Sequence, residues 1–267
     1  MKMILITNDD GVQAPGILAL KQALVDIDRV VVVAPDRERS SIGMAITLNS
    51  PLRLKQVSDD VYSVDGTPVD CVDLALAEIL SRPPNLIISG INRGENLGHD
   101  VHFSGTLAAA RKGALLNVPS LAISQTAWRG PLPHQTVNKP VRLAIPDTLE
   151  GYQSSAQIAS QLVKKVLVDG IPNNVLLNVN VPNLDLSEIR DMVVTRQDRG
   201  LYSAQAIKRE DRYERTYYWI GGVRSTDDHG DDTDIHAVQN NRVSITPIKV
   251  DLTDYQQTES VKNWLSY

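Results

Sequence analysis

The feature that most constrains this chain is its beginning, residues 3–11, which read M-I-L-I-T-N-D-D-G. Four apolar residues stand together without alternation and are followed at once by a polar turn. Such a run is typical of a strand buried on both faces of a parallel sheet. Because ligands bind just beyond the carboxyl ends of strands in open α/β sheets, we expect Asp9 and Asp10 to lie at a binding site.

These two adjacent carboxylates also indicate what the site binds. They repel each other, so we expect a positive charge between or beside them. A hard divalent cation with oxygen ligands is the simplest candidate. The alternative is a purely structural turn, in which residues 8–11 redirect the chain and one aspartate caps the following helix.

The N-terminal two thirds of the chain alternate predicted strands and helices. Apolar residues at helical spacing follow the first strand, and a second apolar run occupies residues 29–34. This β-α-β unit implies a parallel pair of strands with a right-handed crossover. The fold class is therefore expected to be α/β, a Rossmann-like parallel sheet with a β-rich C-terminal extension. Further strands are expected at 86–88, 119–124 and 174–181, helices at 69–80, 104–115 and 158–166, and a hairpin-like excursion at 46–64.

The change in pattern along the chain predicts two parts. Residues 1–184 are expected to form the Rossmann-like catalytic core, with an irregular, proline-rich insertion at 126–151. Residues 185–267 are expected to form an oligomerisation extension, because Tyr213, Tyr217, Tyr218 and Trp219 lie together in one β-prone run. A two-stranded ribbon is marginal alone in water, so pairing with another subunit would give a homodimer or homotetramer. The alternative is that this run packs on its own core.

Bulk properties exclude several classes of protein. A formal net charge of −5 argues against binding to nucleic-acid polymers, although a small phosphorylated substrate remains compatible with it. Cys71 is the single cysteine, which excludes an intrachain disulfide and favours a reducing, cytoplasmic location. Its apolar neighbours indicate a packed core residue rather than a nucleophile. No apolar run approaches the roughly 18 residues that a membrane span needs, so we expect no membrane insertion.

Polar oxygen donors follow three successive predicted strands. Asp9 and Asp10 follow the first strand, Ser40 the second, and Asn92 and Asn96 the third. Because parallel strands bring their carboxyl ends to one edge, we expect these side chains to converge. Their oxygens suit Mg²⁺, Mn²⁺ or Ca²⁺ rather than a thiolate-bound zinc ion.

The chain has no P-loop and no dinucleotide fingerprint, so a phosphate group must be held in another way. The stretch Ser104, Gly105 and Thr106 opens a predicted helix, whose free N–H groups suit an anion. Ordinary helix capping is the alternative for Ser104 and Thr106. Asn8 and Asn96 are further candidates for contact with the substrate. No residue stands out as a stacking partner for a nucleobase, since aromatic residues make up only 4% of the chain.

Several long motifs follow one another along the chain: N-D-D-G (8–11), A-P-G-I (14–17), V-A-P-D-R-E-R-S (33–40), D-G-T-P-V-D-C-V (65–72), S-G-I-N-R-G-E-N-L-G (89–98), S-G-T-L-A-A-A (104–110), W-I-G-G (219–222) and V-S-I-T-P-I (243–248). Together, and in this order, they resemble the SurE family of survival proteins, which are metal-dependent 5′-nucleotidases. The resemblance is dense over residues 3–124 and thinner afterwards. It departs from the family pattern in the 126–151 stretch and in the acidic loop at 227–232.

The resemblance implies one divalent ion per subunit, bound by Asp9, Asp10, Ser40 and Asn92. It also implies hydrolysis of nucleoside 5′-monophosphates, with 3′-nucleotides and short polyphosphates tolerated, and a dimer or tetramer held by the C-terminal arm. Asp9 would either attack phosphorus itself or activate a metal-bound water. The rival hypotheses are a nucleotide- or metal-binding regulatory module without turnover and a Rossmann-type glycosyltransferase. Twin carboxylates disfavour the first, and the small C-terminal part disfavours the second.

Overall fold

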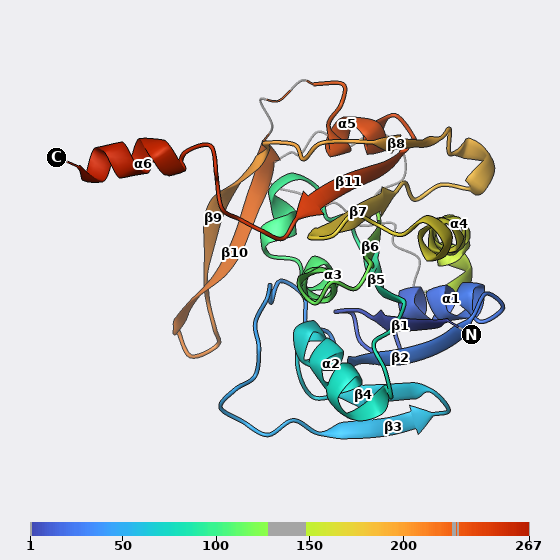
Figure 1. Ribbon diagram of the computed structural model, residues 1–267. Coiled ribbons are helices and arrows are strands. Elements are labelled where there is room, and N and C mark those ends of the chain that lie inside the picture. The colour runs from blue at the N-terminus through green and yellow to red at the C-terminus, as the bar shows by residue number, and fades with distance from the viewer. Residues whose placement is uncertain (1, 128–147, 226–227, 229, 267) are drawn as a thin grey trace.

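A computed structural model describes all residues except 1, 128–147, 226–227, 229 and 267, and within these described residues it forms a nine-stranded sheet and a separate two-stranded ribbon (Figure 1). The order of strands in the sheet is β3-β4-β2-β1-β5-β6-β7-β11-β8. The strands are β1 (Met3–Thr7), β2 (Arg29–Pro35), β3 (Leu54–Ser58), β4 (Val61–Val64), β5 (Leu86–Arg93), β6 (Ser120–Gln125), β7 (Val175–Val181), β8 (Met192–Val194) and β11 (Val243–Lys249), and the ribbon consists of β9 (Leu201–Glu210) and β10 (Thr216–Ser225).

The central strands are parallel, as the sequence predicts. β1 pairs with β2 on one side and with β5 on the other, and β5, β6 and β7 continue in the same direction. All five residues of β1 are buried, which explains why its sequence shows no polar alternation. The expected Rossmann-like α/β fold is therefore confirmed, and the turn after β1 lies at the carboxyl edge of the parallel strands.

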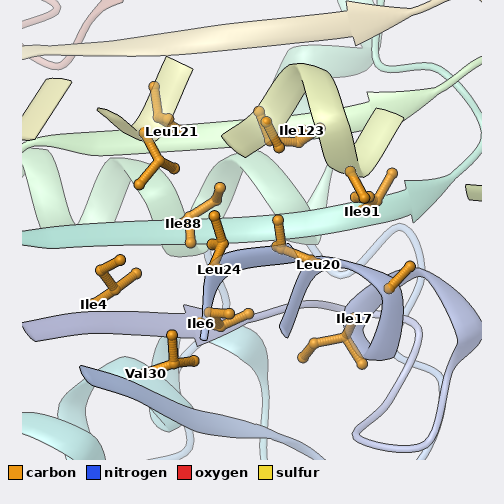
Figure 2. Close-up of a cluster of buried hydrophobic side chains, with 14 of the residues drawn as sticks. Ile4, Ile6, Ile17, Leu20, Leu24, Val30, Ile88, Ile91, Leu121 and Ile123 are labelled. Atoms are coloured by element: carbon orange, nitrogen blue, oxygen red, sulfur yellow. The ribbon is translucent and has the colours of Figure 1, made fainter. Parts of the chain in front are cut away.

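Helices cover both faces of the sheet (Figure 1). α1 and α4 lie on one face, where α1 packs on β1 residues Ile4 and Ile6 (Figure 2) and α4 packs on β5 and β6. α2 and α3 lie on the other, where Cys71 is fully buried among residues that include Met3 and Leu5. Alternate residues of β1 thus serve two separate cores. The helices are α1 (Pro15–Leu24), α2 (Pro68–Leu74, continued by a π-helix at Ala75–Ile79), α3 (Gly105–Leu115), α4 (Gln153–Asp169), α5 (Asp234–Gln239) and α6 (Thr258–Leu265), with short 3₁₀ turns at Gly98–His102, Leu149–Tyr152 and Leu186–Glu188.

Both edges of the sheet come from segments outside the simple β-α-β repeat. The excursion between β2 and α2 forms the hairpin β3–β4, with β4 parallel to β2 and β3 at the edge. At the far edge, β11 runs antiparallel to β7, and β8 pairs with β11. The segment after residue 184 therefore supplies strands to the main sheet as well as the separate ribbon.

The ribbon β9–β10 and helix α6 project from the body of the molecule (Figure 1). The ribbon pairs over ten residues from each strand, and its apolar side chains include Trp219, which is 64% exposed, and Ile220, which is 81% exposed. α6 has no buried residue, and its Trp264 is 74% exposed. Most of the predicted insertion at 126–151 and part of the acidic loop at 227–232 lie outside the described residues. Among the described helices, none has the length and apolar content that crossing a membrane requires.

Candidate active site

The turn after β1 is closed by the side chain of Asn8. The amide nitrogen of Asn8 donates to the carbonyl of Gly11 at 2.9 Å, and the Gly11 N–H donates back to Asn8 Oδ1 at 3.2 Å. Gly11 has a φ of 107°, a backbone conformation that residues with a Cβ rarely adopt. Asn8, which we expected to contact the substrate, is fully buried and uses its polar groups to shape the turn that presents the two aspartates.

Asp9 faces the first turn of α3. Its Oδ1 accepts a hydrogen bond from the Thr106 hydroxyl at 2.6 Å, and its Oδ2 accepts one from the Thr106 N–H at 3.1 Å. The helix can approach this closely because Gly105 has no side chain: a Cβ there would lie 2.8 Å from Asp9 Oδ2. Asp9 is only 3% exposed, and its two hydrogen bonds to Thr106 hold the carboxylate in place.

Asp10 lies beside Asp9 but is partly exposed, and its Oδ2 accepts a hydrogen bond from the Arg93 N–H at 2.9 Å. Burial, and next the neighbouring Asp9 charge, raise the pKa of Asp10 to about 7. Burial likewise raises the pKa of Asp9, against the lowering effect of the Thr106 hydrogen bonds. Two carboxyl groups whose ionised forms are disfavoured by burial and by each other make an environment that a bound metal ion would stabilise.

Ser40 and Asn92 reach the same hollow from two other strand ends. The Ser40 hydroxyl is exposed and donates to Glu38 Oε1 at 2.8 Å. Asn92 stands where the pairing of β5 with β6 shifts register, and its Nδ2 donates to the Gly94 carbonyl at 2.9 Å. The hollow has a volume of about 640 Å³, and its walls come from four segments of the chain. The lining residues are Asp9, Ser40, Ser41, Asn92, Arg93, Gly94, Glu95, Asn96, Asp100, Phe103, Ser104 and Ala127.

The donor set fits a hard cation. Within the part of the chain that the structure describes, no group of three or more histidine, cysteine, aspartate or glutamate side chains is arranged to hold a metal ion. A metal at this site would therefore combine two carboxylates with the neutral oxygens of Ser40 and Asn92. Carboxylate, hydroxyl and amide oxygens suit Mg²⁺, Mn²⁺ or Ca²⁺, and the absence of a thiolate disfavours a structural zinc site.

Asn96 lines the hollow, but most of its polar groups hold the loop in place. Its N–H donates to Asn180 Oδ1, and its side-chain nitrogen donates to Ser124 Oγ, both at 2.8 Å. Its carbonyl accepts hydrogen bonds from the side chains of Asn178 and Asn180. The loop between β5 and α3 is thus fixed to β6 and β7 by buried amide groups.

The start of α3 combines helix capping with contacts to the aspartate turn. Ser104 is an ordinary helix cap, since its Oγ accepts from the Leu107 N–H at 3.1 Å, yet it also lines the hollow. Thr106 directs both its hydroxyl and its N–H toward Asp9. Gly105 provides the close approach between them.

Two features of the site lie outside the sequence-based prediction. Phe103, the single phenylalanine of the chain, lines the hollow and is 64% exposed. Its position directly before the S-G-T motif was the available signal. The second feature is Asp234, fully buried, whose Oδ2 accepts from the Gly98 N–H at 2.9 Å and whose Oδ1 accepts from the Asp198 N–H at 3.0 Å. Residues beyond 184 therefore brace the loop that follows β5 and carries Asn96.

Fold and site together define a Rossmann-like α/β protein with an acidic, oxygen-rich site at the carboxyl edge of its parallel strands. The family model described as "Survival protein SurE" matches residues 4–204. The chain therefore belongs to the SurE family, as its motifs predict.

Individual proteins of this family match over nearly their whole length. The "5′-nucleotidase SurE" of Pelobacter propionicus is 43% identical, over 98% of this chain and 99% of that protein. The protein of the same name from Geobacter sulfurreducens is 41% identical, over 98% of this chain and 93% of that protein. The crystal structure of the SurE protein from Aquifex aeolicus superposes with a TM-score of 0.82 at 39% identity, covering 99% of this chain and all of that one.

Proposed function

We propose that this chain is a divalent-metal-dependent 5′-nucleotidase, which hydrolyses nucleoside 5′-monophosphates to a nucleoside and inorganic phosphate. The observation that carries the proposal is the carboxylate pair of buried Asp9 and partly exposed Asp10 at the carboxyl edge of the parallel strands, in a chain whose relatives bear the name of this activity. 3′-Nucleotides and short polyphosphates are secondary substrates of the same proposed site. Neither a regulatory module without turnover nor a glycosyltransferase is favoured by these relatives.

Asp9, Asp10, Ser40 and Asn92 are the proposed ligands of one Mg²⁺ or Mn²⁺ ion. When bound, such an ion would polarise a phosphoryl oxygen and neutralise charge that develops in the transition state. Thr106 fixes the orientation of Asp9 through two hydrogen bonds, so this ligand needs no rearrangement when the substrate arrives. Asn92 uses its side-chain nitrogen on Gly94, which leaves the amide oxygen as its ligand atom.

The phosphate of the substrate is proposed to lie between the proposed metal ion and the segment 96–106, which ends in the first turn of α3. Ser104 and Asn96 both line the hollow there. The beginning of α3, an eleven-residue helix, contributes the favourable electrostatic potential of its N-terminus.

We further propose that the ribbon β9–β10 and helix α6 hold a homodimer or homotetramer. Support comes from their exposed apolar side chains, among them Tyr218, Trp219, Ile220 and Trp264. Large apolar groups gathered on a projecting element are typical of protein interfaces.

The direct experiment measures phosphate release from AMP and GMP by the purified protein, first treated with EDTA and then supplied with Mg²⁺ or Mn²⁺. We expect no turnover without metal and recovery with either ion. Asp9→Asn and Asp10→Asn should each lower kcat by several orders of magnitude. Asp59→Asn, in the exposed turn between β3 and β4, is the matched control and should retain full activity. Undiminished turnover in the metal-free protein would refute the proposal.

A further inference from the structure

We propose that Phe103 is the stacking platform for the nucleobase of the substrate and that it favours purine nucleotides. This inference rests on the proposed function and extends it to the part of the substrate that does not react.

The exposure of Phe103 is the first observation. Phe103 is 64% exposed, and no other phenylalanine occurs in the chain. Aromatic side chains contribute strongly to binding when they are covered, so an exposed phenylalanine in the wall of the hollow offers a surface that a ligand can cover. Phe103 shares the wall of that hollow with Asp9 and Ser40, the proposed metal ligands.

The backbone of Phe103 is held on both sides. Its N–H donates to the Asp100 carbonyl at 2.9 Å, and its carbonyl accepts from the Gly43 N–H at 2.9 Å. The next residue, Ser104, caps α3. The backbone that carries the ring is therefore fixed before a ligand binds. A ligand that stacks on the ring loses little binding free energy to ordering of the backbone.

The place of Phe103 in the chain is compatible with the length of a nucleotide. Phe103 is three residues before Thr106, whose N–H and hydroxyl bind Asp9. Three trans peptide units separate Cα atoms by at most about 11 Å. In a nucleoside monophosphate, the ribose separates phosphorus from the base by a comparable length. With the phosphate bound beside Asp9, the base of the nucleotide is thus within the span that separates Asp9 from Phe103 along the wall of the hollow, and we propose that it stacks there.

Stacking also predicts the class of substrate. A phenyl ring presents a π-face that any base can cover, and the larger purine ring system covers more of it than a pyrimidine does. We therefore expect purine 5′-monophosphates to have lower KM values than pyrimidine 5′-monophosphates. Ribose 5-phosphate has the phosphate and the sugar but no base, so Phe103 should not contribute to its binding free energy.

The experiment compares wild type, Phe103→Ala and Phe103→Tyr with AMP, CMP and ribose 5-phosphate, and includes Leu115→Ala as a control on an exposed position near the end of α3. In Phe103→Ala we expect KM for AMP to rise by about 5- to 150-fold, with a smaller rise for CMP. Ribose 5-phosphate kinetics should change little, because the loss concerns binding of the base. Phe103→Tyr keeps the aromatic face and should retain the low KM for AMP.

Two outcomes would overturn the stacking role. An unchanged KM for AMP in Phe103→Ala would overturn it. If the sedimentation coefficient of this variant also changed, the ring would instead belong to a contact between subunits. An equal loss for AMP and ribose 5-phosphate would indicate disturbance of the phosphate end instead. Failure of the proposed function is distinguishable, because wild-type protein would then release no phosphate from any of the substrates, and the stacking proposal would fall with it.

Discussion

Thr106 donates two hydrogen bonds to the carboxylate of Asp9, one from its hydroxyl at 2.6 Å and one from its backbone N–H at 3.1 Å. The two residues are 97 positions apart in the chain, at the end of β1 and the start of α3. Both are buried. This pair therefore connects the aspartate turn to the helix start that we propose for phosphate binding.

The variant Thr106→Val tests this connection, because it keeps the N–H and the approximate volume and removes the hydroxyl. Asp9 Oδ1 then loses a buried donor, which should cost about 1–3 kcal/mol of unfolding free energy. Activity should fall at least about tenfold, since Asp9 is no longer held in one orientation. Urea denaturation and phosphate release from AMP measure the two effects. Thr106→Ser restores the hydroxyl and should recover most of both; equal losses in the two variants would contradict the role of this hydrogen bond.

Ser40→Ala and Asn92→Ala should weaken metal binding more than they weaken the fold. Each removes one neutral oxygen from the proposed ligand set, while Ser40 is exposed and Asn92 only partly buried. We expect the metal concentration for half-maximal activity to rise about tenfold or more in each variant. The melting temperature of the metal-free protein should stay close to that of wild type. An unchanged metal midpoint in both variants would remove these residues from the ligand set.

Asp234→Asn should loosen the loop at residues 94–98. The Asp234 carboxylate accepts from the N–H groups of Gly98, Asp198 and Ile235, whereas an asparagine would turn its own NH₂ toward one of these donors. We expect a loss of about 1–3 kcal/mol in unfolding free energy.

Hydrogen exchange should also become faster in that loop. Asp232→Asn is the control, because Asp232 is exposed and its ion pair with Arg196 is worth little. Slow exchange at Gly98 in Asp234→Asn, as in wild type, would contradict the bracing role.

Deleting residues 209–221 should convert the proposed homodimer or homotetramer to smaller species. The deletion removes the tip of the ribbon, including Tyr218, Trp219 and Ile220, which are 59%, 64% and 81% exposed. Sedimentation velocity measures the change, and Ile220→Asp tests the same surface with a single substitution. The nine-stranded sheet of the described residues does not include the ribbon, and the proposed metal site lies at the edge of that sheet. Each subunit of the deletion variant should therefore keep its EDTA-sensitive activity. A wild-type protein that sediments as a monomer at micromolar concentration would end this proposal.

Much of the central fold could be predicted from the sequence because burial leaves a local pattern. An apolar run without alternation specifies a strand buried on both faces, and β1 is such a strand. The β-α-β order then implies parallel pairing, which places Asp9, Ser40 and Asn92 at one edge of the sheet. All three line one hollow in the structure. That convergence follows from strand direction alone, and direction follows from the order of elements.

Only the tertiary structure shows the contacts between residues that are distant in sequence. Asn8 closes its own turn, but Asp9 is oriented by Thr106, and Gly98 is held by Asp234, 136 positions later. The pairing of β11 with β7 likewise depends on a contact between distant segments. Local periodicity records only whether a residue is buried, while its partner is chosen by long-range packing. For the same reason, the sequence shows Phe103 only as the neighbour of the S-G-T motif, and it is the fold that places this exposed residue on the wall of the hollow.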